Sequence, residues 1–188
     1  DSDTAITLTG DLTLSTAGGD LTLGGALNGT AANTQSLTLN AGSAGAVGVT
    51  GAVGQTTSLR TLTLANSNGA TFSSAVTTGT SVVLSDTVAG QTIRFADDLS
   101  TPALTTTANG YNLELLGSNT NVTGNTTFLN TGRLVLGDAA ADSLSFAGGL
   151  TATAPSAIHV AGTVGTATAN PLLQIITPDG LNHQEVIG

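Results

Sequence analysis

The sequence predicts an all-β fold in which short strands stack in parallel as a β-solenoid. Apolar and polar residues alternate over runs as short as three residues, a pattern typical of half-buried strands. Gly-Gly and Asn-Gly pairs separate these runs and favour turns. Only 3% of the 188 residues are aromatic, which is too little for the bulky core of a two-sheet sandwich, whereas stacked coils need only a narrow one.

The predicted strands follow one another along the chain as triplets of an apolar, any and an apolar residue. Threonine occupies the central position in several of them, and no segment has convincing helical spacing. In chain order the triplets are Leu12–Leu14, Leu21–Leu23, Leu37–Leu39, Val47–Val49, Leu62–Leu64, Val82–Leu84, Ile93–Phe95, Leu113–Leu115, Leu134–Leu136, Leu144–Phe146 and Ile158–Val160.

The spacing of the triplets predicts the length of a coil. Leu62, Val82, Leu113 and Leu134 begin triplets at intervals of roughly 20 or 30 residues, so we expect coils of about 20 residues and roughly nine coils. Residues 1–170 are predicted to form one β-helix repeat domain. Residues 171–188 depart from the pattern and are expected to be a terminal strand, a tail or the start of a following module.

The charge of the chain argues against two classes of partner. Asp and Glu number 12 against three arginines and no lysine, for a formal net charge of −9. Nucleic-acid binding and adsorption to anionic membranes both need clustered basic side chains, and no apolar stretch is long enough to span a bilayer. We therefore expect no nucleic-acid partner and no membrane insertion. Without cysteine there is neither a disulfide nor a thiolate metal site.

The most enzyme-like residues are Asp97 and Asp98, with Asp86 and Arg94 nearby in the sequence. Some β-helix enzymes that cleave polysaccharides present carboxylates on adjacent coils, so a polysaccharide-active enzyme using Asp97 and Asp98 is one alternative function. Acidic residues after a strand usually form solvated turns, and the aromatic and basic residues of a saccharide groove are scarce in this chain. We predict no enzymatic activity and no catalytic residues.

The remaining titratable residues predict no cofactor and no metal site. Asp138 and Asp142 lie near a glycine, but the calcium-binding solenoid repeat Gly-Gly-x-Gly-x-Asp is not present in tandem copies. His159 is the central residue of its triplet and is expected to face solvent, and His183 lies in the divergent tail. Three Asn-x-Thr sequences, which accept glycans only where the source glycosylates its surface proteins, begin at Asn28, Asn121 and Asn125.

Outward-facing threonines suggest a third function. The central residues of four early triplets are Thr13, Thr22, Thr38 and Thr63. Stacked threonines on a flat solenoid face resemble the surface of ice-binding proteins. Later in the chain, the same position is occupied by Val83, Arg94, Glu114, Val135, Ser145 and His159. We therefore expect charges to interrupt the column, and we retain a Thr-array ice-binding protein only as an alternative.

The segment from Gly51 to Gly79 resembles a known family of repeats. A glycine-rich turn is followed by Thr57-Ser58-Leu59, the strand Leu62-Thr63-Leu64, and then Gly69, Phe72 and Val76-Thr77. This order is similar to the degenerate repeats of very large secreted bacterial proteins of the filamentous-haemagglutinin and autotransporter-passenger type. The likeness extends loosely from Ile6 to Val164.

The resemblance implies a right-handed parallel β-helix that is exported and displayed outside the cell as a stalk, adhesin or matrix component. We accordingly predict a non-enzymatic structural or adhesive protein, secreted or held at the cell surface. Surface glycans are candidate partners.

The two ends of the predicted solenoid favour self-association. Two strands, Ile6–Leu8 and Leu12–Leu14, follow closely after the charged gatekeepers Asp1 and Asp3. Near the other end lie the apolar pairs Leu172-Leu173 and Ile175-Ile176. Because unpaired strand edges recruit further strands, we expect these edges to pair with flanking solenoid coils or with copies of the same chain in a filament.

Overall fold

The computed structural model describes residues 4–166 and 173–175 of the chain. These residues form 21 short strands, β1 to β21, and include no helix, hence none long and apolar enough to cross a membrane. Every ladder between two described strands is parallel. The predicted all-β solenoid is therefore confirmed.

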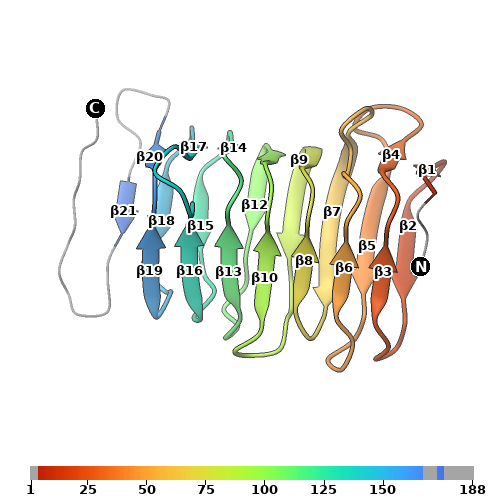
Figure 1. The fold of residues 1–188 in the computed structure, drawn as a ribbon, viewed down its shortest axis with the longest axis horizontal. Helices are drawn as coiled ribbons and strands as arrows, with labels where there is room; N and C mark the ends of the chain where they lie inside the picture. The colour runs from red at the N-terminus through yellow and green to blue at the C-terminus, as the bar shows by residue number, and fades with distance from the viewer. Residues whose placement is uncertain (1–3, 167–172, 176–188) are drawn as a thin grey trace.

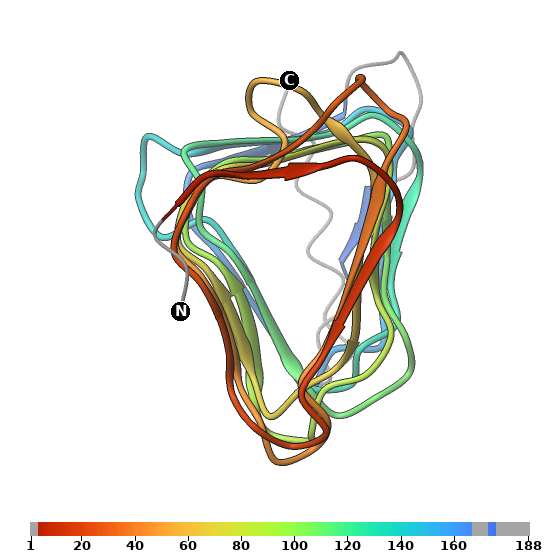
Figure 2. The same ribbon diagram turned by 90° about the vertical axis from the view of Figure 1, so that its right-hand side faces the viewer.

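Each coil contributes to three faces, which enclose a roughly triangular cross-section (Figure 2). Face A is a seven-stranded sheet of β3 (Leu21–Leu23), β6 (Val47–Val49), β8 (Ala70–Phe72), β10 (Thr92–Phe95), β13 (Asn112–Leu115), β16 (Arg133–Leu136) and β19 (Ala157–Val160).

Face B begins with β2 (Leu12–Ser15), β5 (Ser36–Asn40), β7 (Leu59–Asn66), the second half of β9 (Val76–Leu84) and β12 (Ala103–Thr105). It continues with β15 (Thr126–Phe128), β18 (Leu150–Ala152) and β21 (Leu173–Ile175). Face C consists of β1 (Ile6–Leu8), β4 (Leu27–Gly29), the first half of β9, β11 (Leu99–Thr101), β14 (Asn119–Val122), β17 (Ser143–Phe146) and β20 (Thr163–Gly165).

Strand β9 is shared by two faces because it continues around a corner. Val76 pairs with Leu99 on face C, while Ser81 and Val83 lie between β7 and β12 on face B. The sequence predicted only the second half, Val82–Leu84, as a strand. The bend in β9 joins faces B and C into one hydrogen-bonded sheet.

The winding of the coils is right-handed. The N-terminal coil lies at the right of Figure 1, and Figure 2 views the molecule from that end. From there the chain turns clockwise as it recedes, which is the sense of a right-handed helix.

The solenoid has about seven coils of roughly 23 residues, so the expectation of nine coils was wrong. The prediction took its repeat from the shorter coils, such as the one between Leu113 and Leu134. The N-terminal coils are longer: Leu21 pairs with Val47, 26 residues further along the chain. Their extra residues lie in connections between strands, and the pattern of apolar residues gives no information on the length of these connections.

The core is a set of apolar columns that run along the solenoid axis. On face A, for example, Leu113 stacks on Ile93 and under Leu134, and all three are fully buried. Aromatic rings occupy the same columns. Phe72 and Phe95 lie in stacked contact with ring centroids 4.8 Å apart. All five aromatic side chains of the sequence are buried in the core.

Glycine is required where one corner packs on the backbone of the next. A Cβ atom on Gly51 would lie 2.2 Å from the carbonyl carbon of Gly25 in the preceding coil. No side chain fits there, because real Cβ contacts do not become this short. The small residues at corners are therefore a condition for close stacking of the coils.

The structure also describes part of the predicted tail. Leu173–Ile175 forms β21, which pairs with β18 and adds a strand to face B. The predictions that concern Asp1, Asp3, Leu172, Ile176 and His183 lie outside the described residues. On face A the last described strand is β19, where Val160 is 47% exposed although it continues a buried column.

Candidate functional site

Three of the four Arg, Lys, Asp or Glu residues that lie in described strands are on face A. One outward column of this face reads Thr22, Gly48, Thr71, Arg94, Glu114, Val135 and His159. Glu114 is the sole acidic residue within the seven strands of face A, and Arg94 and Arg133 are their basic residues. The other described acidic side chains all lie in the connections between strands.

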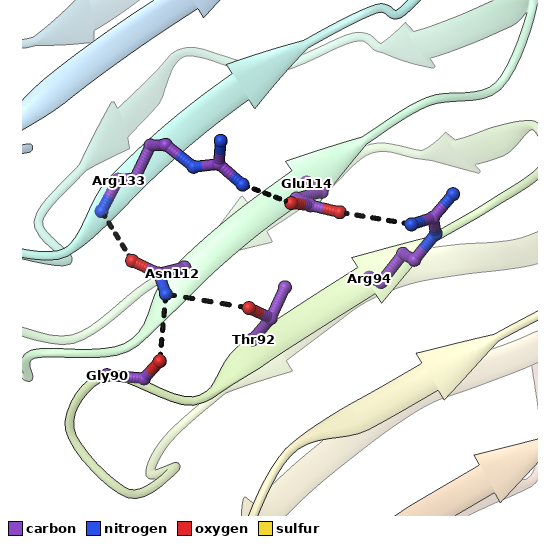
Figure 3. Close-up of polar contacts among 6 residues, drawn as sticks. All are labelled: Gly90, Thr92, Arg94, Asn112, Glu114 and Arg133. Carbon is purple, nitrogen blue, oxygen red and sulfur yellow. Dashed lines mark hydrogen bonds and ion pairs between the residues drawn. The ribbon is translucent and has the colours of Figure 1, made fainter.

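Arg94, Glu114 and Arg133 form an ion-pair cluster over three successive coils, which we call the arginine cluster (Figure 3). Arg94 Nη1 lies 3.5 Å from Glu114 Oε2, and Arg133 Nη2 lies 2.7 Å from Glu114 Oε1. The side chain of Glu114 is 12% exposed, whereas each arginine side chain is 46% exposed. The carboxylate therefore lies beneath two guanidinium groups that face solvent.

The backbone around the arginine cluster is fixed by Asn112. Its Nδ2 donates to the carbonyl oxygen of Gly90 at 3.0 Å, and its Oδ1 accepts the N–H of Arg133 at 2.8 Å. A longer contact of 3.5 Å joins Nδ2 to Thr92 Oγ1 (Figure 3). One amide side chain thus links the three coils that carry the two arginines and the glutamate.

The arginine cluster carries a formal charge of +1, since two guanidiniums share one carboxylate. This is a local excess of positive charge on a chain whose formal net charge is −9. A guanidinium has five N–H donors, and among the described contacts Arg94 and Arg133 each use one side-chain donor. Because each arginine side chain is 46% exposed, unused donors are accessible to an anionic group from solvent.

The third arginine lies elsewhere. Arg60 Nη2 lies 2.8 Å from Asp11 Oδ2, and Arg60 Nε donates to Ser36 Oγ at 3.0 Å, both at the edge of face B. Its charge is balanced by an acidic partner of its own. Exposed pairs of this kind contribute about 0.2–1 kcal/mol to stability.

The acidic residues proposed for an enzyme do not converge. Asp86 precedes β10 and Asp97 follows it, so the two lie at opposite corners of face A. Asp86 Oδ1 accepts a hydrogen bond from Asn109 Nδ2 at 3.0 Å, and Arg94 is directed at Glu114. The residues considered for the alternative enzyme function therefore form no single group: Asp86 lies at another corner from Asp97, and Arg94 is paired with Glu114.

Asp98 holds the next coil in place. Its Oδ1 accepts the backbone N–H of Asn119 at 2.8 Å and contacts Ser118 Oγ at 3.4 Å. The neighbouring Asp97 accepts only the N–H of Asp98, at 2.7 Å, among the described contacts. A side-chain oxygen of Asp98 therefore replaces a carbonyl oxygen at the start of the ladder between β11 and β14.

The contact made by Asp98 recurs along the solenoid. In each case an Asp or Asn immediately before the first apolar residue of a strand accepts a backbone N–H from the next coil, at 2.8 Å. The acceptors are Asp11, Asp20, Asp98 and Asn112. This role was not predicted from the sequence, although part of the signal is present: each of these residues directly precedes a leucine, and three of the leucines, Leu12, Leu21 and Leu113, begin a predicted strand.

The Asp142 carboxylate also accepts hydrogen bonds from the backbone. Its Oδ2 accepts the N–H groups of Asp138 and Ala139 at 2.8 and 2.9 Å, and these hydrogen bonds lower the pKa of the Asp142 carboxyl below its ordinary value. The two aspartates considered for calcium thus build a turn. The described residues hold no group of three or more His, Asp or Glu side chains suited to a metal ion.

The other candidate residues are placed as follows. His159 is exposed on β19, as its central position predicted. Asn28 Oδ1 accepts the N–H groups of Thr56 and Thr57, so its side chain is engaged in the fold. Asn121 and Asn125 are exposed on and after β14.

Face B carries the longest series of threonines. Its central outward column reads Thr13, Thr38, Thr63, Val83 and Thr105, and Thr127 pairs with Thr151 where the face continues. Of the residues expected to interrupt the column, Val83 does lie in it. The others lie on other faces: Arg94, Glu114, Val135 and His159 on face A, and Ser145 on face C. The predicted charge-broken column was therefore wrong, as was the inclusion of Thr22, which lies on face A.

Comparison of the chain with protein-family models, with curated proteins and with solved structures finds no match.

Proposed function

We propose that this chain is a non-enzymatic structural and adhesive segment of an extracellular protein, either secreted or displayed on a cell surface. The observation that carries the proposal is the parallel stack of coils around a single apolar core. Acidic side chains along this stack serve as backbone acceptors at the corners instead of meeting in a cleft. The resemblance of Gly51–Gly79 to filamentous-haemagglutinin-type repeats supports the extracellular setting.

The partners we propose are further coils and surface glycans. A parallel stack can be lengthened by one coil at a time, whether by flanking sequence or by a second copy, because each coil offers the same set of N–H and C=O groups to the next. A rod of this kind presents its faces repeatedly, which suits weak, repeated contacts with a polymer.

The experiment combines binding and turnover measurements on the purified chain. It should bind glycan-coated or cell-derived surfaces and leave acidic and neutral polysaccharides uncleaved. Turnover that disappears in the double variant Asp97→Asn/Asp98→Asn would replace the proposal with the enzyme alternative. Electron microscopy and light scattering test end-to-end assembly, and a monomer at every concentration would contradict self-association.

The threonine column of face B favours ice binding as a second candidate function. Parallel pairing spaces its outward groups by about 4.8 Å along the rod, and Ser36, Thr61 and Ser81 add a second hydroxyl column beside it. The strands of face B carry one charged residue, Arg60. A regular, nearly uncharged hydroxyl and methyl surface can order adjacent water.

Inhibition of ice recrystallisation tests this second candidate directly. The variant Thr63→Tyr would disrupt the column, while Thr71→Tyr makes the same change at an outward position of face A. Loss of inhibition in the first variant alone would support ice binding. An unmodified chain without any inhibition at high concentration would eliminate it.

A further inference from the structure

Two of the three arginines meet on one glutamate although they are 39 residues apart in the sequence. Other positions of the same outward column on face A are neutral, such as Gly48 and Val135. The pairing of Glu114 with a single arginine would already neutralise its charge. The second arginine is therefore in excess of what local charge balance requires.

We propose that the arginine cluster is a binding site for carboxylate-bearing polysaccharides, in which Arg94 and Arg133 hold the uronate groups of a chain lying along the solenoid axis. This inference rests on the adhesive function proposed above and names the ligand class and the residues for it. The ligand is a polysaccharide in which every sugar, or one sugar of each disaccharide repeat, is a uronic acid.

The chemistry of the ligand follows from what the two guanidiniums already hold. Each binds one oxygen of the Glu114 carboxylate, so this surface is shaped for a carboxylate on its inner side. Guanidinium is planar and presents paired N–H groups that match a carboxylate. The exposed 46% of each arginine side chain leaves such N–H groups available to a second carboxylate from solvent.

The geometry favours a polymer over a small anion. Arg94 and Arg133 lie on β10 and β16, which are separated by β13, so their backbones are about 10 Å apart along the axis. This separation is comparable to the length of a disaccharide unit in an extended polysaccharide. The outward neighbours Thr92 and Asn112 are neutral and polar, which suits contact with sugar hydroxyls.

The binding is expected to be weak and dependent on salt. The cluster offers a single net charge, Glu114 repels an incoming anion, and both arginines are partly solvated. Affinity for a long polymer then comes from the attachment of one polysaccharide molecule to many copies of the protein. Glu114 lowers the affinity of the site for anions, because its carboxylate neutralises one of the two positive charges of the arginines.

The test measures binding of polygalacturonate and alginate to the full chain by affinity electrophoresis across a series of NaCl concentrations. Dextran sulfate and neutral dextran serve as comparison polymers. Arg133→Gln and Arg94→Gln should each weaken binding to the uronates about threefold to tenfold, and the double variant should abolish it. Arg60→Gln is the matched control, since it removes the same charge from an ion pair at the edge of face B.

The variant Glu114→Gln should change uronate binding in the opposite direction. It raises the formal charge of the cluster from +1 to +2 and should strengthen uronate binding several-fold, a change that a merely structural role for the ion pairs would not produce. Circular dichroism and a thermal melt establish that each variant is folded.

Three outcomes would overturn the proposal. Arg60→Gln could weaken binding as much as Arg133→Gln, Glu114→Gln could leave it unchanged, or the chain could bind only the sulfated polymer. If other glycans or cells are bound and the arginine variants have no effect, the adhesive function stands and this site is refuted. If nothing is bound, both fail.

Discussion

Replacing Asp98 by alanine should loosen one rung of the solenoid, and the structure sets the size of the effect. The Oδ1 atom of Asp98 lies 2.8 Å from the backbone nitrogen of Asn119. This contact joins a carboxylate to the first N–H of β14. A hydrogen bond to a charged group contributes roughly 1.5–3 kcal/mol, and partial exposure of Asp98 reduces this to about 1 kcal/mol. For a chain of this length the loss corresponds to about 2–4 °C in Tm.

The neighbouring carboxylate supplies the control. Asp97→Ala removes the same charge, but the described contacts of Asp97 reach only the adjacent N–H of Asp98. Because both variants remove one negative charge at adjacent positions, the difference between them mainly reports the contacts of Asp98 with Ser118 and Asn119. Asp98→Asn retains an acceptor oxygen and should lose no more than a few tenths of a kcal/mol.

Amide hydrogen exchange is the sharpest assay, because a solenoid can open locally without unfolding as a whole. The N–H of Asn119 should exchange faster in Asp98→Ala than in Asp97→Ala, while amides in distant coils keep their rates. Equal effects from the two alanine variants would refute the reasoning. So would an Asp98→Asn protein as unstable as Asp98→Ala, since the charge would then matter and the acceptor would not.

Three further predictions concern the core, a corner and pH. Phe95→Ala should lower the free energy of unfolding by about 3–5 kcal/mol, because Phe95 is buried and stacked on Phe72; urea denaturation compares it with Thr92→Ala, on the same strand, which should cost far less. Gly51→Ala should be strongly destabilising, since its Cβ would meet the Gly25 backbone at 2.2 Å, whereas Gly48→Ala places a methyl group in open space on face A and should be neutral or slightly stabilising in a thermal melt. The lowered pKa of Asp142 gives a contribution to stability that is complete above about pH 4, the ordinary range of aspartate, and is lost as the pH falls through the lower folded pKa. Melting temperatures measured from pH 6 to pH 2 should therefore fall more steeply for the unmodified protein than for Asp142→Asn, and parallel curves would contradict this role.

Local alternation was sufficient to predict many of the strands and the direction of their side chains, but it missed others, such as β4, β11 and β14. Every predicted triplet lies within a strand of the structure, and central residues such as Thr13 and His159 face outward. This success has a simple physical reason. A strand with one buried side must alternate, and a shift by one residue would expose its whole apolar set.

The assignment of strands to faces could not be read in the same way. A triplet on face A, such as Leu21–Leu23, has the same apolar pattern as one on face B, such as Leu12–Leu14. Only the count of residues around each coil separates them, and this count varies because the corners differ in length. For this reason the column expected from the sequence wrongly combined the threonines of face B with the charged residues of face A.

The arginine cluster depends on this same count. Arg94 and Glu114 are 20 residues apart and become neighbours because the coil between them is short. Arg133 then reaches Glu114 diagonally from the next strand. A sequence-based search for metal or catalytic residues does not find such a group, since its chemistry arises from register and not from a motif.

The bend in β9 has a mechanical consequence. When a rod of this construction is pulled from its two ends, the force acts along the inter-coil hydrogen bonds and opens them one coil after another. Each released coil of roughly 23 residues lengthens the chain by about 80 Å. Opening at β9 must detach faces B and C together, because the same strand is bonded on both. Extension from either end should therefore pause at this coil, and the rod would absorb tension in two stages.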